Sequence, residues 1–376
     1  MLDYNPNLAK IMQDEKTFIE ANGAKIQIKS IPDDARTGVM DPREYRMALD
    51  RADAFTKMAR PDASATPSDA PADPMAAIYG MRAMMGFANY NMNRAEIYTR
   101  YDEVELGGNK VGIWAYYPRR PIGKTDRKAF IYIHGGGWVG GSVFAVENPC
   151  RLLAERADSV VFNIDYALAP EKPFPSGFND CWNALKYIYD NAESYGIDRE
   201  KIGMGGDSAG GNLTACVAVK DRDLGTNMLK YQVLLYPAVT FDNNIQGYKW
   251  NIDNYEIAEE QHAIIEPGLN LGRPRDGVEG TGMNAMYLQG GEDARMPYIS
   301  PVFAEKKGLC KCLIMVAEFD GLRVQGEYYG KLLSEAGVDT RVIRYKGVGH
   351  AFLDKLGVLP QAEDAVQEIA NDLIAL

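Results

Sequence analysis

Ser208 is the residue of this chain whose surroundings point most directly to covalent chemistry. It stands in a Gly-Asp-Ser-Ala-Gly segment, with Gly206 two residues before it and Gly210 two residues after it. A short apolar run precedes the segment, and a helical pattern follows from residue 212. Such a strand-to-helix turn is typical of a nucleophile elbow, in which a strained backbone exposes the serine hydroxyl to a substrate carbonyl. The spacing predicts a nucleophilic serine, with the N-terminus of the next helix directed at developing negative charge.

The same glycines allow a second interpretation. The spacing of Gly203, Gly205 and Ser208 half-resembles the glycine fingerprint of dinucleotide-binding proteins. The third small residue is here a serine, and no acidic residue clearly ends a following strand to hold a ribose. Nucleotide binding stays an alternative at this point, and the rest of the chain has to decide between the two.

A catalytic serine needs a general base and an acid that orients this base. The chain has three histidines. His350 lies in a glycine-flanked loop after the last apolar run, and Asp320 follows the run before it, so both stand where the carboxyl ends of parallel strands meet. Taken alone, His350 could be a surface histidine and Asp320 a helix N-cap. Glu318 is the nearest competing acid and is expected to point away, and His262 is interpreted as an ordinary polar helix residue.

Donors for an oxyanion are predicted in a glycine loop. Three consecutive glycines begin at Gly135, directly after the apolar run 130–133 and His134, and a tryptophan follows them. Bare N–H groups in such a loop beside a serine elbow can form an oxyanion hole. The alternative is a merely flexible turn, which the apolar run before it and the tryptophan after it disfavour. We expect Gly135 and Gly136 to donate together with Ala209, and His134 to orient the loop.

Composition excludes several classes of protein. The chain has 376 residues, of which 46% are apolar and 25% are charged, as in an ordinary globular protein. Its net charge of −11 argues against nucleic acid as a partner, because phosphate binding needs basic surface. No apolar stretch approaches the length of a membrane span, and the N-terminus lacks the pattern of a signal peptide, so we expect no stable membrane insertion and a cytoplasmic location. The five cysteines are scattered and show no zinc-site spacing, so we expect reduced thiols and no metal.

The order of elements predicts an α/β fold. From residue 95 onward, short apolar runs alternate with helical patterns, which is typical of a parallel sheet covered on both faces. Residues 1–94 look helical and irregular, with an exposed linker or loop at 60–74 that is rich in Pro, Ala, Ser and Asp. A methionine-rich segment follows the linker and is either helix core or an adaptable lid. Residues 239–298 interrupt the alternation and are interpreted as an insertion.

Four segments in this order resemble the hormone-sensitive-lipase-type esterases of the α/β-hydrolase superfamily. They are His-Gly-Gly-Gly-Trp at 134–138, Asp-Tyr-Ala-Leu-Ala-Pro-Glu at 165–171, Gly-Asp-Ser-Ala-Gly at 206–210 and Gly-His-Ala-Phe at 349–352. The chain order Ser208, Asp320, His350 is also the order in which this fold places its triad. Two departures are visible: Gly321 follows the acid where the family usually has proline, and Ala167 replaces a usual arginine, so any salt bridge of that arginine is missing.

The resemblance implies both an architecture and an activity. It implies a mostly parallel, eight-stranded sheet with helices on both faces, built from residues 95–238 and 299–376, under a cap formed by a helical region at 1–94 and by the insertion at 239–298. It also implies a serine carboxylesterase that hydrolyses short-chain esters without a metal or organic cofactor. Trp138, Asp207 and aromatic or methionine residues of the cap are expected to wall the pocket. Relatives form dimers through the last strand and its neighbouring helix, so the resemblance also allows a homodimer.

Two further functions share these motifs. An amidase or formamidase would use the same catalytic residues, and only substrate testing separates it from an esterase. A small-molecule receptor on this fold would be expected to have lost a residue of the triad, whereas Ser208, Asp320 and His350 are all present.

Overall fold

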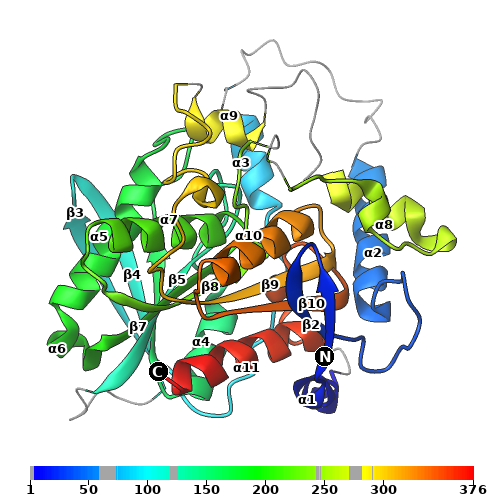
Figure 1. Cartoon of the computed structure of the whole chain (residues 1–376), viewed down its shortest axis with the longest axis horizontal. Coiled ribbons are helices and arrows are strands. Elements are labelled where there is room, and N and C mark those ends of the chain that lie inside the picture. The colour runs from blue at the N-terminus through cyan, green and yellow to red at the C-terminus, as the bar shows by residue number, and fades with distance from the viewer. Residues whose placement is uncertain are drawn as a thin grey trace.

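A single ten-stranded sheet forms the centre of the computed structural model (Figure 1), in the order β1-β2-β10-β9-β8-β7-β5-β6-β4-β3. The structure describes residues 4–58, 73, 75–118, 126–242, 245, 247–270, 282–289 and 291–376. The strands are β1 (Thr17–Ala21), β2 (Ala24–Lys29), β3 (Tyr98–Leu106), β4 (Asn109–Tyr117), β5 (Arg127–Ile133), β6 (Val160–Asp165), β7 (Ile197–Asp207), β8 (Leu229–Leu235), β9 (Lys311–Phe319) and β10 (Thr340–Gly349).

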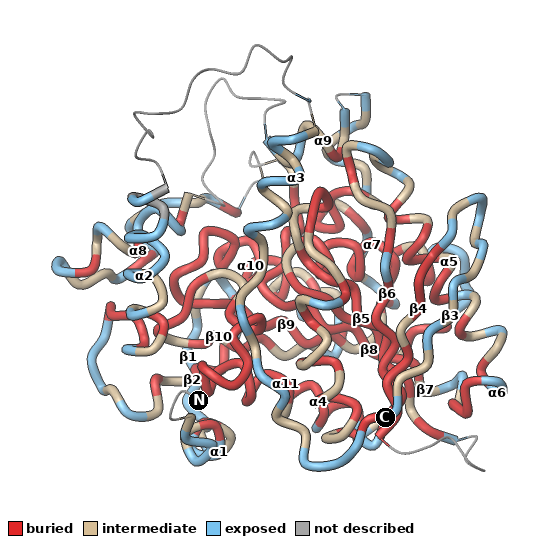
Figure 2. Tube along the Cα trace, turned by 180° about the vertical axis from the view of Figure 1, so that it is seen from behind, coloured by how far each residue is buried: buried red, intermediate tan, exposed pale blue. Residues whose placement is uncertain are grey.

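The middle of the sheet is parallel, as the sequence predicts. Strands β6, β5, β7, β8, β9, β10 and β2 run in one direction, and β1, β3 and β4 join by antiparallel pairing. The central strands are buried along nearly their whole length rather than on alternate residues, because both faces of the sheet are covered. Figure 2 shows this buried centre beneath more exposed segments.

Helices cover the two faces of the sheet and form two separate groups of buried apolar side chains. One face carries α5 (Ser176–Asp190), α6 (Ala192–Tyr195), α7 (Ala209–Asp223) and α10 (Arg323–Glu335), and the other carries α1 (Pro6–Asp14), α4 (Glu147–Ala157) and α11 (Pro360–Ile374) (Figure 1). Along β5 the side chains alternate between the groups: Phe130 belongs to one and Ile131 to the other. The α/β-hydrolase fold with helices on both faces is therefore confirmed.

The sheet has ten strands rather than the eight expected, because the N-terminal segment contributes a hairpin. Residues Asn22 and Gly23 both have positive φ, of 52° and 76°, and form the tight turn between β1 and β2. The region expected to be helical thus adds two strands to the sheet. Strand β2 pairs in parallel with β10, with Ile26 beside Val342. The edge of β10 that a dimer through the last strand would use is therefore already paired within the chain.

The described parts of 1–94 and 239–298 also contribute helices that lie outside the sheet. They include α2 (Pro42–Met58), α3 (Ala76–Ala83), η1 (Ile252–Asn254), η2 (Glu259–Gln261), α8 (His262–Leu269) and α9 (Met283–Leu288), and η4 (Pro301–Phe303) and η5 (Phe352–Lys355) lie nearer the core. Figure 2 shows α2, α3, α8 and α9 as largely exposed or half-buried. The predicted linker at 60–74 lies outside the described residues except for Asp73.

Candidate active site

Ser208 occupies a strained turn between β7 and α7. Its backbone has φ 53° and ψ −114°, a conformation that is unusual for a residue with a side chain. The neighbouring chain leaves no room for side chains around it: a Cβ on Gly206 would lie 2.6 Å from the Gly210 carbonyl carbon, and one on Gly210 would lie 2.7 Å from the His134 carbonyl oxygen. The elbow is held in place by the Ser208 N–H, which donates to the Leu235 carbonyl at 2.8 Å. The glycine spacing in the sequence thus has a steric cause.

The structure brings together the three residues expected to form a triad. The His350 Nε2 lies 2.9 Å from the Ser208 Oγ, and the His350 Nδ1 lies 2.7 Å from the Asp320 Oδ2. The three residues follow the ends of β7, β9 and β10, which are the carboxyl ends of parallel strands. Asp320 is fully buried, and its other oxygen accepts a hydrogen bond of 2.9 Å from the Leu322 N–H. A serine, an imidazole and an oriented carboxylate in this chain of contacts can perform nucleophilic catalysis.

Two tyrosines that no sequence pattern singled out contact the expected triad residues. The ring of Tyr236, just after β8, packs edge-on against His350 at 5.0 Å between centroids. The hydroxyl of Tyr255, in the 239–298 insertion, donates to the Asp320 carbonyl at 2.9 Å. Both contacts join residues far apart in the sequence, so only the fold shows them.

The competing acid and the other histidine lie elsewhere. Glu318 accepts a hydrogen bond of 2.8 Å from the Gly347 N–H and lies 3.5 Å from Lys346, so it faces the backbone of β10. His262 begins α8, where its imidazole lies 4.0 Å from the Glu266 carboxylate, and its side chain is 42% exposed. These placements agree with the expectation for both residues.

His134 stabilises the glycine loop from below. It is buried, its Nδ1 lies 2.8 Å from the Gly135 carbonyl oxygen, and its ring stacks on Tyr166 at 4.4 Å. The Tyr166 hydroxyl in turn donates to the His134 carbonyl at 2.8 Å. Burial lowers the pKa of His134 to about 4, so the imidazole is neutral at pH 7. This environment fits the structural role that the sequence suggested.

Gly135 is not available as an oxyanion donor, which corrects the expectation for this residue. Its N–H donates to the Asp207 Oδ1 at 2.9 Å. Within the described parts of the chain, the N–H groups of Gly136, Gly137 and Ala209 have no acceptor. The sequence alone does not show which of these glycine N–H groups is free to bind an oxyanion, because this depends on where the Asp207 carboxylate points.

Asp207 does not wall a pocket, which is a second correction. It is 4% exposed, and the same Oδ1 accepts hydrogen bonds from the Tyr132 hydroxyl at 3.0 Å and from the Gly135 N–H. Burial raises the pKa of Asp207 to about 6 against the lowering effect of these two donors. Its carboxylate therefore lies beneath the glycine loop and fixes the first peptide of that loop.

Trp138 belongs to an aromatic cluster that joins the glycine loop to the insertion. Its ring stacks on Tyr287 of α9 at 4.9 Å and lies 4.8 Å from Phe241. Its Nε1 donates to the Asn212 Oδ1 at 3.3 Å. The Trp138 side chain is only 6% exposed, so it packs inside the protein and offers little surface to line a substrate pocket.

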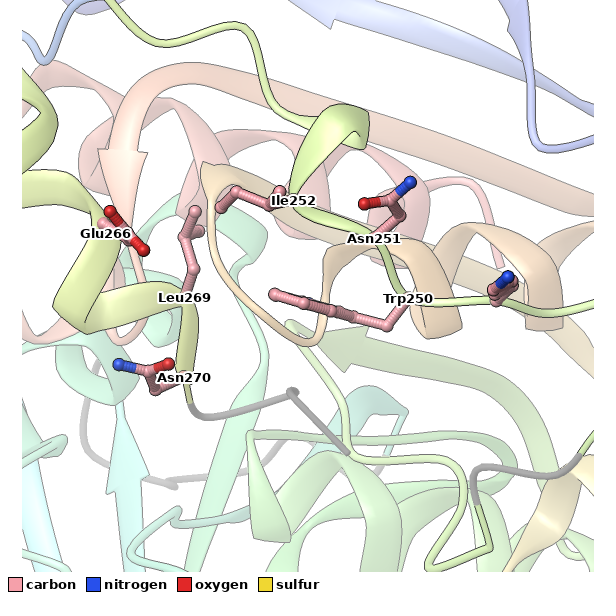
Figure 3. Close-up of a pocket in the computed structure, with 7 residues that line it drawn as sticks. Trp250, Asn251, Ile252, Glu266, Leu269 and Asn270 are labelled. Carbon is pink, nitrogen blue, oxygen red and sulfur yellow. The ribbon is translucent and has the colours of Figure 1, made fainter. Parts of the chain in front are cut away.

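A separate hollow lies within the insertion. It is a cavity of about 310 Å³, lined by Lys249, Trp250, Asn251, Ile252, Glu266, Leu269 and Asn270. Figure 3 shows how six of these side chains, all but Lys249, surround it. Its lining comes from η1, α8 and the adjoining residues, and it includes no residue of the triad. We assign it no part in the chemistry.

Neither a metal-binding cluster nor a membrane-spanning helix is found among the described residues. In this part of the chain, no group of three or more His, Cys, Asp or Glu side chains could hold a metal ion, and the five cysteines are free thiols. None of the helices there has the length and apolarity needed to cross a membrane.

Comparison with known proteins shows the family to which the chain belongs. A family model of the α/β-hydrolase fold matches residues 130–354. The arylesterase of Saccharolobus solfataricus is 36% identical over 261 residues, which cover 68% of this chain and 77% of the relative. Carboxylesterase NlhH of Mycobacterium tuberculosis is 30% identical over 264 residues, with 69% and 76% covered. Arylacetamide deacetylase of Oryctolagus cuniculus is 40% identical over 183 residues, with 44% and 46% covered.

Solved structures agree with this placement. The hyperthermophilic esterase of the archaeon Pyrobaculum calidifontis superposes with a TM-score of 0.67 at 29% identity, over 90% of this chain and 98% of the esterase. The chain therefore belongs to the α/β-hydrolase family. Within that family it falls among the esterases of the hormone-sensitive-lipase type, as its motifs led us to expect.

Proposed function

We propose that this protein is a serine carboxylesterase in which Ser208, His350 and Asp320 act as a catalytic triad. The observation that carries the proposal is the continuous chain of short contacts from the Ser208 hydroxyl through the His350 imidazole to the buried Asp320 carboxylate. Ser208 attacks the ester carbonyl while the His350 Nε2 takes its proton and later delivers it to the leaving alcohol. Asp320 holds the Nδ1–H tautomer and stabilises the imidazolium. Water then hydrolyses the acyl-enzyme by the same route.

The oxyanion of each tetrahedral intermediate is assigned to the N–H groups of Gly136, Gly137 and Ala209. Support comes from their free hydrogens and from the position of Ala209 as the first residue of α7, where N–H groups and the helix dipole favour negative charge. Gly137 takes the place that the sequence had suggested for Gly135. A donor already bonded to a carboxylate, as in Gly135, would have to break that bond to serve an oxyanion.

A short acyl chain and a cap are further parts of the proposal. A Cβ on Gly137 would lie 3.1 Å from the Met283 Cε and closer still to its sulfur, so α9 of the insertion lies directly over the glycine loop. Met85, which follows α3, lies in the same way over Gly140. Flexible methionines from both 1–94 and 239–298 thus cover the loop, which supports a small, adaptable apolar pocket under a cap.

The names of two relatives, a carboxylesterase and an arylesterase, support the hydrolysis of carboxylic esters by this chain. Amide hydrolysis is the second candidate, and the observation that favours it is the similarity to arylacetamide deacetylase. A receptor without catalysis is disfavoured, because the triad is both complete and in contact.

The test is hydrolysis of p-nitrophenyl esters of increasing acyl length, with acetanilides measured in parallel. The intact protein should turn over short esters fastest, and Ser208→Ala should remove nearly all of this activity. A matched control is Ser194→Ala, which removes an exposed serine hydroxyl that donates to the Asn191 carbonyl. Turnover of anilides but not of esters would favour the amidase, and a folded protein that is inert on both would overturn the proposal.

A further inference from the structure

The helix α3 lies over the glycine loop although packing alone does not hold it there. None of its eight residues, all of which the structure describes, is buried. Its apolar contact with the core is made by the half-buried side chains of Ile78 and Met81, so apolar burial alone stabilises its position only weakly. Arg82, near its C-terminal end, makes hydrogen bonds to the catalytic core, and Met85 just beyond the helix packs over Gly140.

Arg82 uses its whole guanidinium fork at this junction. Its Nε donates to the Val139 carbonyl at 2.6 Å, and its Nη2 donates to the Ala169 carbonyl at 3.0 Å. The Glu171 carboxylate closes the arrangement, with distances of 2.8 Å to the Nη1 and 2.7 Å to the Nη2. One side chain thus joins three segments, which are α3, the glycine loop and the 165–171 segment.

Val139 belongs to the same short turn as the proposed oxyanion donors. The Gly136 carbonyl accepts from the Val139 N–H at 3.2 Å and from the Gly140 N–H at 2.9 Å. The Trp138 carbonyl accepts from the Ala169 N–H at 2.9 Å. The side chain of Arg82 also fills the space over Gly140, where a Cβ would lie 3.1 Å from the Arg82 Cγ. Arg82 therefore contacts the outer side of the turn that carries the proposed oxyanion donors.

We propose that Arg82 is a positioning residue for the oxyanion hole, through which docking of α3 holds the peptides of Gly136 and Gly137 in their catalytic orientation. The inference rests on the proposed function. It assigns to the N-terminal segment a part in transition-state stabilisation as well as in covering the pocket. Glu171 then serves to orient and neutralise the guanidinium, and the two backbone bonds do the positioning.

Substitutions at the two ends of this arrangement separate these roles. Arg82→Ala removes all four bonds, and Arg82→Lys keeps a positive charge beside Glu171 but cannot reach two carbonyls and a carboxylate at once. Both should lower kcat about tenfold with KM nearly unchanged, because loosening a donor costs less than the roughly 10²–10³ lost when one is removed. Glu171→Gln keeps an acceptor for Arg82 and both backbone bonds, so it should retain most of kcat.

Arg51→Ala is the matched control. Arg51 donates to the Met84 carbonyl at 3.3 Å, so it contacts the same N-terminal segment without reaching the glycine loop. It should leave kcat unchanged.

A rise in KM at constant kcat for Arg82→Ala would overturn the proposal and leave the cap a role in binding only. A loss in Glu171→Gln equal to that in Arg82→Ala would also overturn it.

A second readout does not depend on ester turnover. Amide hydrogen exchange of the peptide covering residues 136–141, followed by mass spectrometry, should be faster in both Arg82 variants than in the wild type and unchanged in Arg51→Ala. If the wild type hydrolyses no ester and the exchange still responds, the proposed function fails while the coupling of α3 to the loop stands. Equal exchange in all variants would contradict the coupling itself.

Discussion

Replacing Gly136 by alanine should remove most of the catalytic rate while leaving the protein folded. Gly136 has φ of +124°, in a region open almost only to glycine. A Cβ there would lie 2.6 Å from the Gly141 nitrogen and closer still to the Gly140 carbonyl oxygen. Both are backbone atoms, so no side-chain rotation relieves the clash. The turn has to move, and the proposed oxyanion donors move with it.

The size of the effect follows from the loss of one donor. Removing one oxyanion donor costs roughly 10²–10³ in kcat, which is about 2.7–4 kcal/mol of transition-state stabilisation. We expect kcat for p-nitrophenyl acetate to fall by about that factor, with KM much less affected, because the negative charge develops only in the transition state. Steady-state kinetics gives kcat, and thermal unfolding of the same sample checks that the fold persists.

Gly337→Ala separates the loop from general backbone strain. Gly337 also has a positive φ, of 80°, but no atom lies within 4 Å of an added Cβ. This variant should lose about 1–2 kcal/mol of stability from the left-handed conformation and keep its kcat. If Gly136→Ala keeps more than about a third of the wild-type kcat, or if Gly337→Ala loses as much, the assignment of the glycine loop as the oxyanion hole is refuted.

Two further substitutions test other parts of the site. In Asp320→Asn the amide oxygen should accept the hydrogen bond from the Leu322 N–H, which turns the NH₂ group toward the His350 Nδ1. This arrangement favours the wrong tautomer of the imidazole, so kcat should fall by about 10⁴. An unchanged pH–rate profile with near-normal kcat would contradict this. His134 has a folded-state pKa of about 4, below its ordinary value of 6.5, so its contribution to stability is present above pH 6.5 and is lost as the pH falls toward 4. Over that window the wild type should lose about 3 kcal/mol more unfolding free energy than His134→Gln, measured by urea unfolding at each pH, and parallel losses would show that the imidazole is not held neutral.

The sequence was sufficient to predict that Ser208, Asp320 and His350 meet, because each stands at a recognisable place relative to a strand. Ser208 has glycines at fixed spacing, and His350 and Asp320 each follow an apolar run that had to be a strand. Parallel strands bring their carboxyl ends to one edge, so the three residues could be expected to meet before any distance was known.

The features that sequence reasoning missed depend on contacts between distant segments. Gly135 and Gly136 look alike in the sequence, and only the Asp207 carboxylate distinguishes them. Arg82 contacts residues 57 and 89 positions away, a pairing that no local pattern predicts. The N-terminal hairpin is different, because the Asn-Gly turn at Asn22 is a recognisable signal between two strand-like runs. It was missed because the surrounding region reads as helical.

The acyl-enzyme mechanism is tested most directly by trapping the nucleophile. The protein should be incubated with a p-nitrophenyl phosphonate, which forms a stable analogue of the tetrahedral intermediate, and the labelled residue located by peptide mass spectrometry. The mechanism predicts one phosphonyl group per chain, attached to Ser208, with esterase activity lost in proportion to labelling. A label on another residue, or full activity after stoichiometric labelling of Ser208, would contradict it.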